Sequence, residues 1–296
     1  MTAPKNPKRN HHHVWQAYLK PWTTDNQVWC LIDQNVSRKR TKVVAVDRDF
    51  YQLHRLTSDD FSLLKTFIAA GSPGSRRTNQ QLLDMLMTPY RLVENTLNLS
   101  PAAQAAVDRY SYEILEDYHS KIENSFAPLL AKARQGDMSF YSDESCVRFI
   151  NYICTQFMRT KGIKEKFFKK MEETGGPDFS RVWNILIHMF ATNIGAGLYV
   201  ERHKRVLQLL ENTSDVPFIT GDQPIVNLES VAGQAPERLS LYYPISPRMA
   251  LVWGEVDEPP MKTSVSAVDA QNFNAKVKNA SYLELFGDSR EALLKV

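Results

Sequence analysis

The feature that most constrains the fold is one long amphipathic pattern in the middle of the chain. It begins at Ser100, which can cap a helix, and at Pro101, whose missing N–H costs nothing in the first helical position. Apolar residues then recur every three or four positions as far as the segment RQGD: Val107, Tyr110, Ile114, Tyr118, Ile122, Phe126 and Leu130. The pattern predicts a helix of more than about thirty residues, with one buried face and a kink at Pro128.

Further helices are expected on both sides of this one. A helical period starts at Ser58 and closes at the segment SPGS. A second long helix is predicted from Ser142 to about Glu173, where the turn signal TGGPD follows. A third is predicted from residue 180 toward residue 212, with a kink or break at the glycines 195 and 197.

Strand-like segments lie at both ends of the chain. QVWCLI and TKVVAV flank the polar segment DQNVSRKR and predict an N-terminal β-hairpin. After residue 212 the short apolar runs VPFIT, PIVNL, LSLYYPI and MALVW are separated by turn residues, and residues 267–296 read as helix, short strand and helix. This order favours an α+β fold: an N-terminal β-hairpin, long central helices, and a C-terminal mixed β-sheet segment with flanking helices, in a single compact unit. We expect a flexible basic tail over residues 1–10 and one domain over residues 11–296.

Charge, cysteine content, apolar runs and short motifs exclude several classes of protein. The net charge of +3 is too small to argue for nucleic acid by itself. The three cysteines, Cys30, Cys146 and Cys154, lack CxxC spacing, so we expect reduced thiols and neither a disulfide framework nor a structural zinc. No apolar run approaches the roughly 18 residues that a membrane span requires, and the polar N-terminus has no signal-peptide core. A cytoplasmic protein without a membrane partner is expected. Phosphate-loop, dinucleotide-binding, HExxH and GxSxG motifs are not found in the sequence.

Three consecutive histidines open the segment NHHHVWQAYLKPW, residues 10–22. The run continues directly into apolar residues, which is atypical of a purification tag. Neighbouring side chains on an extended segment point to opposite faces, so at most His11 and His13 share a site there; at a helix start, His12 and His13 would diverge by about 100°. One of the three can serve as acid, base or metal ligand, and a purely structural role is the alternative.

Three other segments carry polar residues in suggestive positions. Asp222 follows a strand-like run, where it either takes part in catalysis or binding or caps a turn. Arg248 follows a proline-bracketed bend and suits a carboxylate or phosphate, or else pairs with Asp222. Gln156 has apolar neighbours at helical spacing and Arg159 three residues on, so this pair either lines a polar cleft or forms a structural network.

Five segments in this order resemble the domain-of-unknown-function family numbered 4238: HHVWQAYLKPW, QFMRT, PFITGDQP, YPISPR and FNAKVKNASYLELF, spread over about residues 11–287. The resemblance points to a set of site residues, which are His12, His13, Gln16, Tyr18, Gln156, Arg159, Asp222, Pro224, Arg248 and Asn274. Two positions depart from the family pattern: Trp15 stands where proline is usual, and Gly221 where serine is usual. The resemblance implies a mostly bacterial, intracellular, single-domain protein, and it implies no activity.

The set of polar residues suggests two functions. The first is a hydrolase of nucleic acid or nucleotides, nuclease-like and of a toxin or defence type, in which a divalent metal has a possible place. Its catalytic residues would be His12, His13 and Asp222, and its substrate-binding residues Gln16, Gln156, Arg159, Arg248 and Asn274. The alternative is a binding or sensor protein for a nucleotide or another anionic small molecule. A purely structural interaction module is a third possibility. The hydrolase hypothesis requires His13, Asp222 and Arg248 to converge on one cleft.

Overall fold

The computed structural model describes residues 7–94, 96, 100–142, 144–231, 234, 236, 238–255 and 264–296. The helices are α1 (Gln16–Leu19), α2 (Ser58–Ala70), α3 (Pro73–Glu94), α4 (Pro101–Ala133), α5 (Cys146–Met158), α6 (Lys161–Thr174), α7 (Trp183–Val200), α8 (Ala267–Ala280) and α9 (Arg290–Leu294), with 3-10 turns η1 (Lys20–Trp22), η2 (Thr41–Val43) and η3 (Arg202–Lys204). The strands are β1 (Asn10–His12), β2 (Thr23–Thr24), β3 (Gln27–Ile32), β4 (Asn35–Arg40), β5 (Val46–Arg48), β6 (Arg205–Asn212), β7 (Thr220–Gly221), β8 (Val226–Asn227), β9 (Leu241–Ser246), β10 (Met249–Glu255), β11 (Ser264–Val265) and β12 (Leu285–Gly287). This inventory confirms the predicted α+β class.

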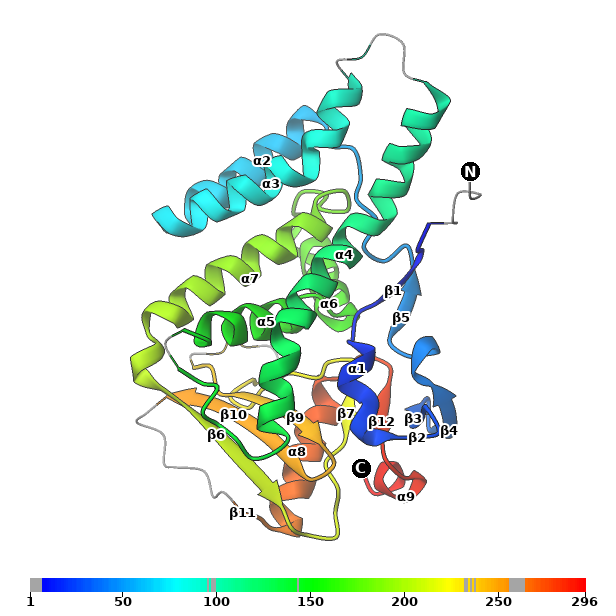
Figure 1. The fold of residues 1–296 in the computed structure, drawn as a ribbon, viewed down its shortest axis with the longest axis vertical. Coiled ribbons are helices and arrows are strands. Elements are labelled where there is room, and N and C mark those ends of the chain that lie inside the picture. The colour runs from blue at the N-terminus through cyan, green and yellow to red at the C-terminus, as the bar shows by residue number, and fades with distance from the viewer. Residues whose placement is uncertain are drawn as a thin grey trace.

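Helix α4 runs from the helical end of the molecule toward the sheets. It starts as predicted, with the Ser100 side chain accepting a hydrogen bond from the Ala103 N–H at 3.2 Å, and it continues through Pro128 to Ala133. Its N-terminal half lies near the α2–α3 pair at one end, and its C-terminal half reaches the sheets at the other (Figure 1). Phe126 of α4 stacks on Tyr152 of α5 with ring centroids 3.9 Å apart. Helix α4 therefore links the helical part to the β part.

The helix predicted from Ser142 to Glu173 is wrong as one element, because the chain breaks between α5 and α6. Arg159 ends α5, and Thr160 is extended, with φ −81° and ψ 157°. Both side chains are buried and bond to distant residues, Arg159 to Glu123 and Thr160 to Gln223. Tertiary hydrogen bonds thus override a locally favourable helix.

Two other local predictions fail for tertiary reasons. Residues 205–212 form strand β6, which pairs with β10, rather than the end of a helix. Gly195 does not break α7; it faces Ile150 and Cys154 of α5, where a Cβ atom would make ordinary van der Waals contacts. Helix α2 ends before the segment SPGS, as predicted, but an unpredicted helix, α3, begins inside that segment at Pro73.

The predicted N-terminal hairpin is formed by β3 and β4. Its turn residues Asp33 and Gln34 have φ of 45° and 68°, the left-handed conformation that a two-residue hairpin turn requires. The second strand is the polar segment NVSRKR, whereas residues 41–45 form η2 and the loop after it, and Val46 begins β5, which pairs with β1. The β-propensity of TKVVAV therefore predicted the wrong partner strand.

Of the sheets in the described residues, one joins opposite ends of the sequence. One sheet has the order β11-β6-β10-β9-β8 and is mixed, since β11 is parallel to β6. In a second five-stranded sheet, β12 lies between β3 and β7, and β4 pairs with β3; β1 and β5 form a separate two-stranded sheet. The largest apolar core accordingly contains residues from Val14 to Phe286. The C-terminal helix, strand and helix predicted for residues 267–296 are confirmed as α8, β12 and α9.

The part of the predicted basic tail that the structure describes is held against the domain. Lys8 forms an ion pair with Asp117, and Arg9 donates to both oxygens of Asp49. Strand β1 then pairs with β5. The other residues of that prediction, 1–6, lie outside the described residues. Within the described residues, no helix is long and apolar enough to cross a membrane.

Candidate functional site

Strand β1 separates the three histidines as its alternation predicts. His11 and His13 are buried, whereas His12 is half-buried on the opposite side. The Nδ1 atom of His11 accepts the Tyr51 N–H at 2.8 Å, and its Nε2 lies 3.1 Å from the Lys8 carbonyl. Both ring nitrogens of His11 are therefore engaged with backbone, as expected for a structural histidine.

His13 is enclosed rather than presented to a cleft. Its backbone N–H donates to Ala45, and its carbonyl accepts from Gln156 Nε2 at 2.8 Å. Its ring packs on Phe50 with centroids 5.4 Å apart. Burial, with a contribution from the positive charges of Lys161 and Arg159, lowers the pKa of His13 to about 3. A neutral, enclosed ring of this kind is unsuited to proton transfer near pH 7.

Gln156 and Arg159 form the structural network that the sequence analysis kept as one alternative. Gln156 Oε1 accepts from Arg159 Nε at 3.0 Å and from Arg159 Nη2 at 2.7 Å. Arg159 Nη2 also donates to Glu123 Oε1 at 2.5 Å. Burial disfavours the Arg159 charge, but Glu123 offsets this and raises the pKa of Arg159. The network joins α5 to α4 and to the backbone of His13.

Asp222 is committed to the backbone of another segment. Its carboxylate accepts hydrogen bonds from the N–H groups of Tyr282, Leu283 and Glu284 at 2.7, 2.7 and 3.0 Å. Only 2% of the residue is exposed. Burial raises the pKa of Asp222, while the three N–H donors act in the opposite direction. This is the turn-capping alternative, and it leaves the carboxylate no open position for catalysis.

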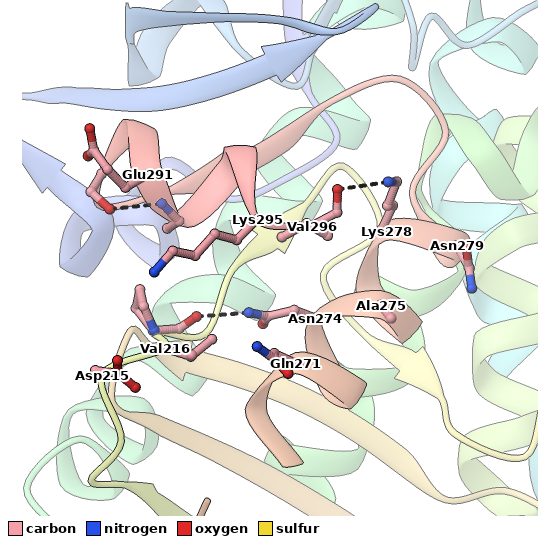
Figure 2. A pocket seen from close by; sticks show the side chains of 13 residues that line it. Asp215, Val216, Gln271, Asn274, Ala275, Lys278, Asn279, Glu291, Lys295 and Val296 are labelled. Atoms are coloured by element: carbon pink, nitrogen blue, oxygen red, sulfur yellow. Dashed lines mark hydrogen bonds between the residues drawn. The ribbon is translucent and has the colours of Figure 1, made fainter. Parts of the chain in front are cut away.

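Asn274 and Arg248 lie at two further places. Asn274 accepts from the Ile219 N–H at 3.0 Å and donates to the Pro217 carbonyl at 2.9 Å. It borders a cavity of about 350 Å³ between α8, α9 and residues 215–217, where its side chain points at that loop (Figure 2). Arg248 is exposed in the β9–β10 turn and donates to the Ser214 carbonyl.

The motif PFITGDQP, residues 217–224, forms hydrogen bonds to the other four motifs and is here called the junction. Tyr18 donates to the Pro244 carbonyl at 2.7 Å, and its hydroxyl lies 2.7 Å from Thr220 Oγ1. Thr160 donates to Gln223. With the Asn274 and Asp222 contacts, these bonds connect all five motifs. Most of the predicted site residues therefore hold the fold together, and the expected single cleft is not formed.

His12 and Gln16 instead line an open cavity of about 440 Å³, here called the His12 cavity. Gln16 Nε2 lies 3.4 Å from His12 Nδ1, and His12 Nε2 lies 3.3 Å from the Lys42 carbonyl. Burial lowers the pKa of His12. The walls come from β1, α1, η1, the β2–β3 turn, η2 and one face of α4.

Two carboxylates that the sequence analysis missed complete this cavity. Glu116, Ser120 and Glu123 lie at positions i, i+4 and i+7 of α4 and line the same wall. Burial raises the pKa of Glu116 to about 7, and among the described residues its Oε2 atom has no hydrogen-bond partner. Glu123 forms the ion pair with Arg159. The helical spacing of these three polar residues was the available signal.

The cavity thus combines two carboxyl groups in different environments with a histidine and an amide. A carboxyl group whose surroundings raise its pKa toward neutral, such as Glu116, is typical of acid–base sites. The described residues contain no group of three or more His, Cys, Asp or Glu side chains arranged to hold a metal ion.

The protein is therefore an α+β protein with an open cavity that is lined by two glutamates, Glu116 and Glu123. The five sequence motifs meet elsewhere, at residues 217–224. The chain belongs to the family described as "Protein of unknown function (DUF4238)", which matches residues 10–291. No curated protein and no solved structure matches the chain.

Proposed function

We propose that the protein is a hydrolase of phosphate esters whose active site is the His12 cavity, with Glu116 as the general acid and Glu123 as the general base. The observation that carries the proposal is the Glu116 carboxyl group. The residue is half-buried, its Oε2 atom is buried without a hydrogen-bond partner among the described residues, and burial raises its pKa to about 7. A carboxylic acid that still holds its proton near neutral pH is suited to protonating a leaving group.

The proposed reaction uses both carboxyl groups. Glu123 accepts a proton from a water molecule, whose oxygen attacks phosphorus. The ester P–O bond breaks, and its electron pair passes to the leaving oxygen, which takes the proton of Glu116. The products are a phosphate with one fewer ester bond and an alcohol, and the two carboxyl groups have exchanged protonation states. Lys20, an exposed cation in the cavity wall, supports an anionic substrate.

His12 and Gln16 serve as binding and positioning groups in this proposal. Both His12 ring nitrogens face neighbouring polar atoms, Gln16 Nε2 and the Lys42 carbonyl, so the ring is oriented rather than free. Asp222 and His13, which the sequence suggested as catalytic, have structural roles here. In the present proposal the catalytic roles of a nuclease-like hydrolase are therefore assigned to Glu116 and Glu123.

The test compares Glu116→Gln with Asp117→Asn, an acid-to-amide change at the next, exposed residue of α4. Substrates are bis(4-nitrophenyl) phosphate, total RNA, single-stranded DNA and plasmid, each with Mg²⁺, Mn²⁺ or EDTA. We expect Glu116→Gln to lower turnover by about 10²–10⁴-fold and Asp117→Asn to leave it near wild type. Wild-type activity should also decline as the pH rises through about 7, because Glu116 loses its proton there.

Equal turnover by the two variants would contradict the proposal. So would folded wild-type protein that turns over none of these substrates. A nucleotide that stabilises the protein without being converted would favour the binding-protein alternative, since a ligand at about 100 times its Kd adds about 2.7 kcal/mol.

A further inference from the structure

Trp15 is the residue of the His12 cavity that the hydrolase proposal leaves unexplained. Its backbone has φ −62° and ψ 123° and caps the N-terminus of α1. This φ lies within the range that proline fixes, so the backbone expected from the family pattern is kept without proline. What the tryptophan adds is an aromatic ring in the cavity wall.

The Trp15 ring is held in place from one side. The rings of Trp15 and Tyr152 meet in a T-shaped arrangement with centroids 6.1 Å apart, and Tyr152 is itself stacked on Phe126. The residue is only partly buried. A supported, partly exposed indole beside a cavity is a stacking platform for a planar ligand.

One lysine lines the same cavity, and two further cations are next in the chain to a residue that lines it. Lys20 of η1 is exposed and lines it. Thr41 lines it too, and the neighbours of Thr41 in the chain, Arg40 and Lys42, are both exposed. Charges on the outer strand β4 also protect a sheet edge from pairing, but Lys20 lies outside that strand and does not serve that purpose.

We propose that the His12 cavity binds one nucleotide unit of a single-stranded nucleic acid. The base stacks on Trp15, and the flanking phosphates contact Lys20, Arg40 and Lys42. An unpaired strand is required because a base in a duplex is already stacked and paired and has no free face for the indole. The cavity, at about 440 Å³, is within the usual range for a ligand of nucleotide size. This inference rests on the proposed function and names its substrate class.

The inference is tested by fluorescence anisotropy with labelled ten-nucleotide RNA and DNA strands and the matching duplex. The background is the full chain carrying Glu116→Gln, which is expected to bind without turnover. We compare Trp15→Leu, Trp15→Phe, Lys42→Ala and the control Lys65→Ala, an exposed lysine of α2. Circular dichroism and thermal unfolding confirm that each variant is folded.

Trp15→Leu should weaken single-strand binding by about 10-fold, while Trp15→Phe should retain most of it. The slope of log Kd against log salt should be about 2 for three phosphate contacts and should fall by about 0.7 in Lys42→Ala, but not in Lys65→Ala. Tighter binding of RNA or of DNA would show whether the site prefers ribose or deoxyribose, and either preference supports the inference.

Three results would overturn it: duplex binding as tight as single-strand binding, no effect of Trp15→Leu, or an unchanged salt slope in Lys42→Ala. Its failure is distinguishable from failure of the proposed function. Glu116-dependent hydrolysis of bis(4-nitrophenyl) phosphate without oligonucleotide binding removes only this inference. Trp15-dependent binding, with no turnover of any substrate by wild type, removes only the hydrolase.

Discussion

Arg159 and Glu123 form an ion pair with N···O 2.5 Å in which 2% of the arginine side chain and 14% of the glutamate side chain are exposed. The pair connects the end of α5 to the middle of α4. Through Gln156 it also reaches the backbone of His13. One polar network therefore joins the wall of the His12 cavity to the first and second sequence motifs, through His13 and through Gln156 and Arg159.

Removing the Arg159 side chain should destabilise the protein strongly. In Arg159→Met, Glu123 loses its partner and Gln156 Oε1 loses the two donors that Arg159 supplies. Breaking a buried ion pair costs about 3–5 kcal/mol, and urea unfolding should show a loss of this size. Arg248→Ala, which removes an exposed arginine bonded to Ser214, should cost about 1 kcal/mol or less. Similar losses in the two variants would contradict the structural role of Arg159.

Asp222→Asn should reduce stability without affecting the chemistry. An amide nitrogen in place of one carboxylate oxygen would face at least one backbone N–H of residues 282–284, and that donor would be left unpaired. The expected cost is about 1–3 kcal/mol of unfolding free energy. Turnover per folded molecule should stay at the wild-type level, and exposed Asp215→Asn serves as the control. A selective loss of turnover in folded Asp222→Asn would restore the catalytic role that the sequence suggested.

Glu116 should make the native state less stable as the pH rises. Its folded pKa of about 7 exceeds the ordinary value of 4.5, so between these values the native state holds a proton that the unfolded state has released. The unfolding free energy then falls with pH by up to roughly 3 kcal/mol across this window. His13, with its lowered pKa, acts in the opposite direction, but it contributes equally to wild type and Glu116→Gln. The unfolding free energy of wild type minus that of Glu116→Gln, from urea unfolding at several pH values, should therefore fall as the pH rises from about 4.5 to about 7, and parallel curves would refute this prediction.

Gly221 and Ser281 should show strong coupling. A Cβ atom built on Gly221 would clash with Ser281 Oγ and would lie 2.9 Å from the Glu284 carbonyl. Gly221→Ala should cost about 1–3 kcal/mol through overpacking. Ser281→Gly in the same chain should recover part of that loss, measured as the interaction energy of a double-mutant cycle. Additive effects would show that the two residues are independent. The same crowding explains why the serine of the family pattern does not fit at position 221.

The fold was predictable where local signals dominate. Ser100 and Pro101 define the start of α4, and the pattern after residue 267 gave the order of α8, β12 and α9. The break at Arg159 and Thr160 was not predictable, because their partners, Glu123 and Gln223, are far away in sequence. Strand β6 likewise depends on pairing with β10. The spacing of apolar residues along one sequence carries no information about partners that are distant in the chain.

The candidate site was only partly predictable. His12 and Gln16 line the open cavity, and their segment was singled out correctly. Asp222 and Asn274 were misleading because buried polar residues that tie segments together have the same chemical composition as catalytic ones. Glu116 and Glu123 escaped notice because a carboxylate on a long amphipathic helix ordinarily faces solvent. Their shared face becomes informative only once α1 and η2 are known to cover it.

Strand β12 lies between β3 and β7, although β3 belongs to the first tenth or so of the chain and β12 to its end. During synthesis, β3 leaves the ribosome long before its neighbour exists. The N-terminal hairpin must therefore wait with one edge unpaired while the rest of the chain is translated. Closure of this sheet, and with it burial of the Asp222 carboxylate by residues 282–284, is a late folding event. A premature stop shortly before β12 would leave a nearly complete polypeptide with an exposed sheet edge prone to aggregation.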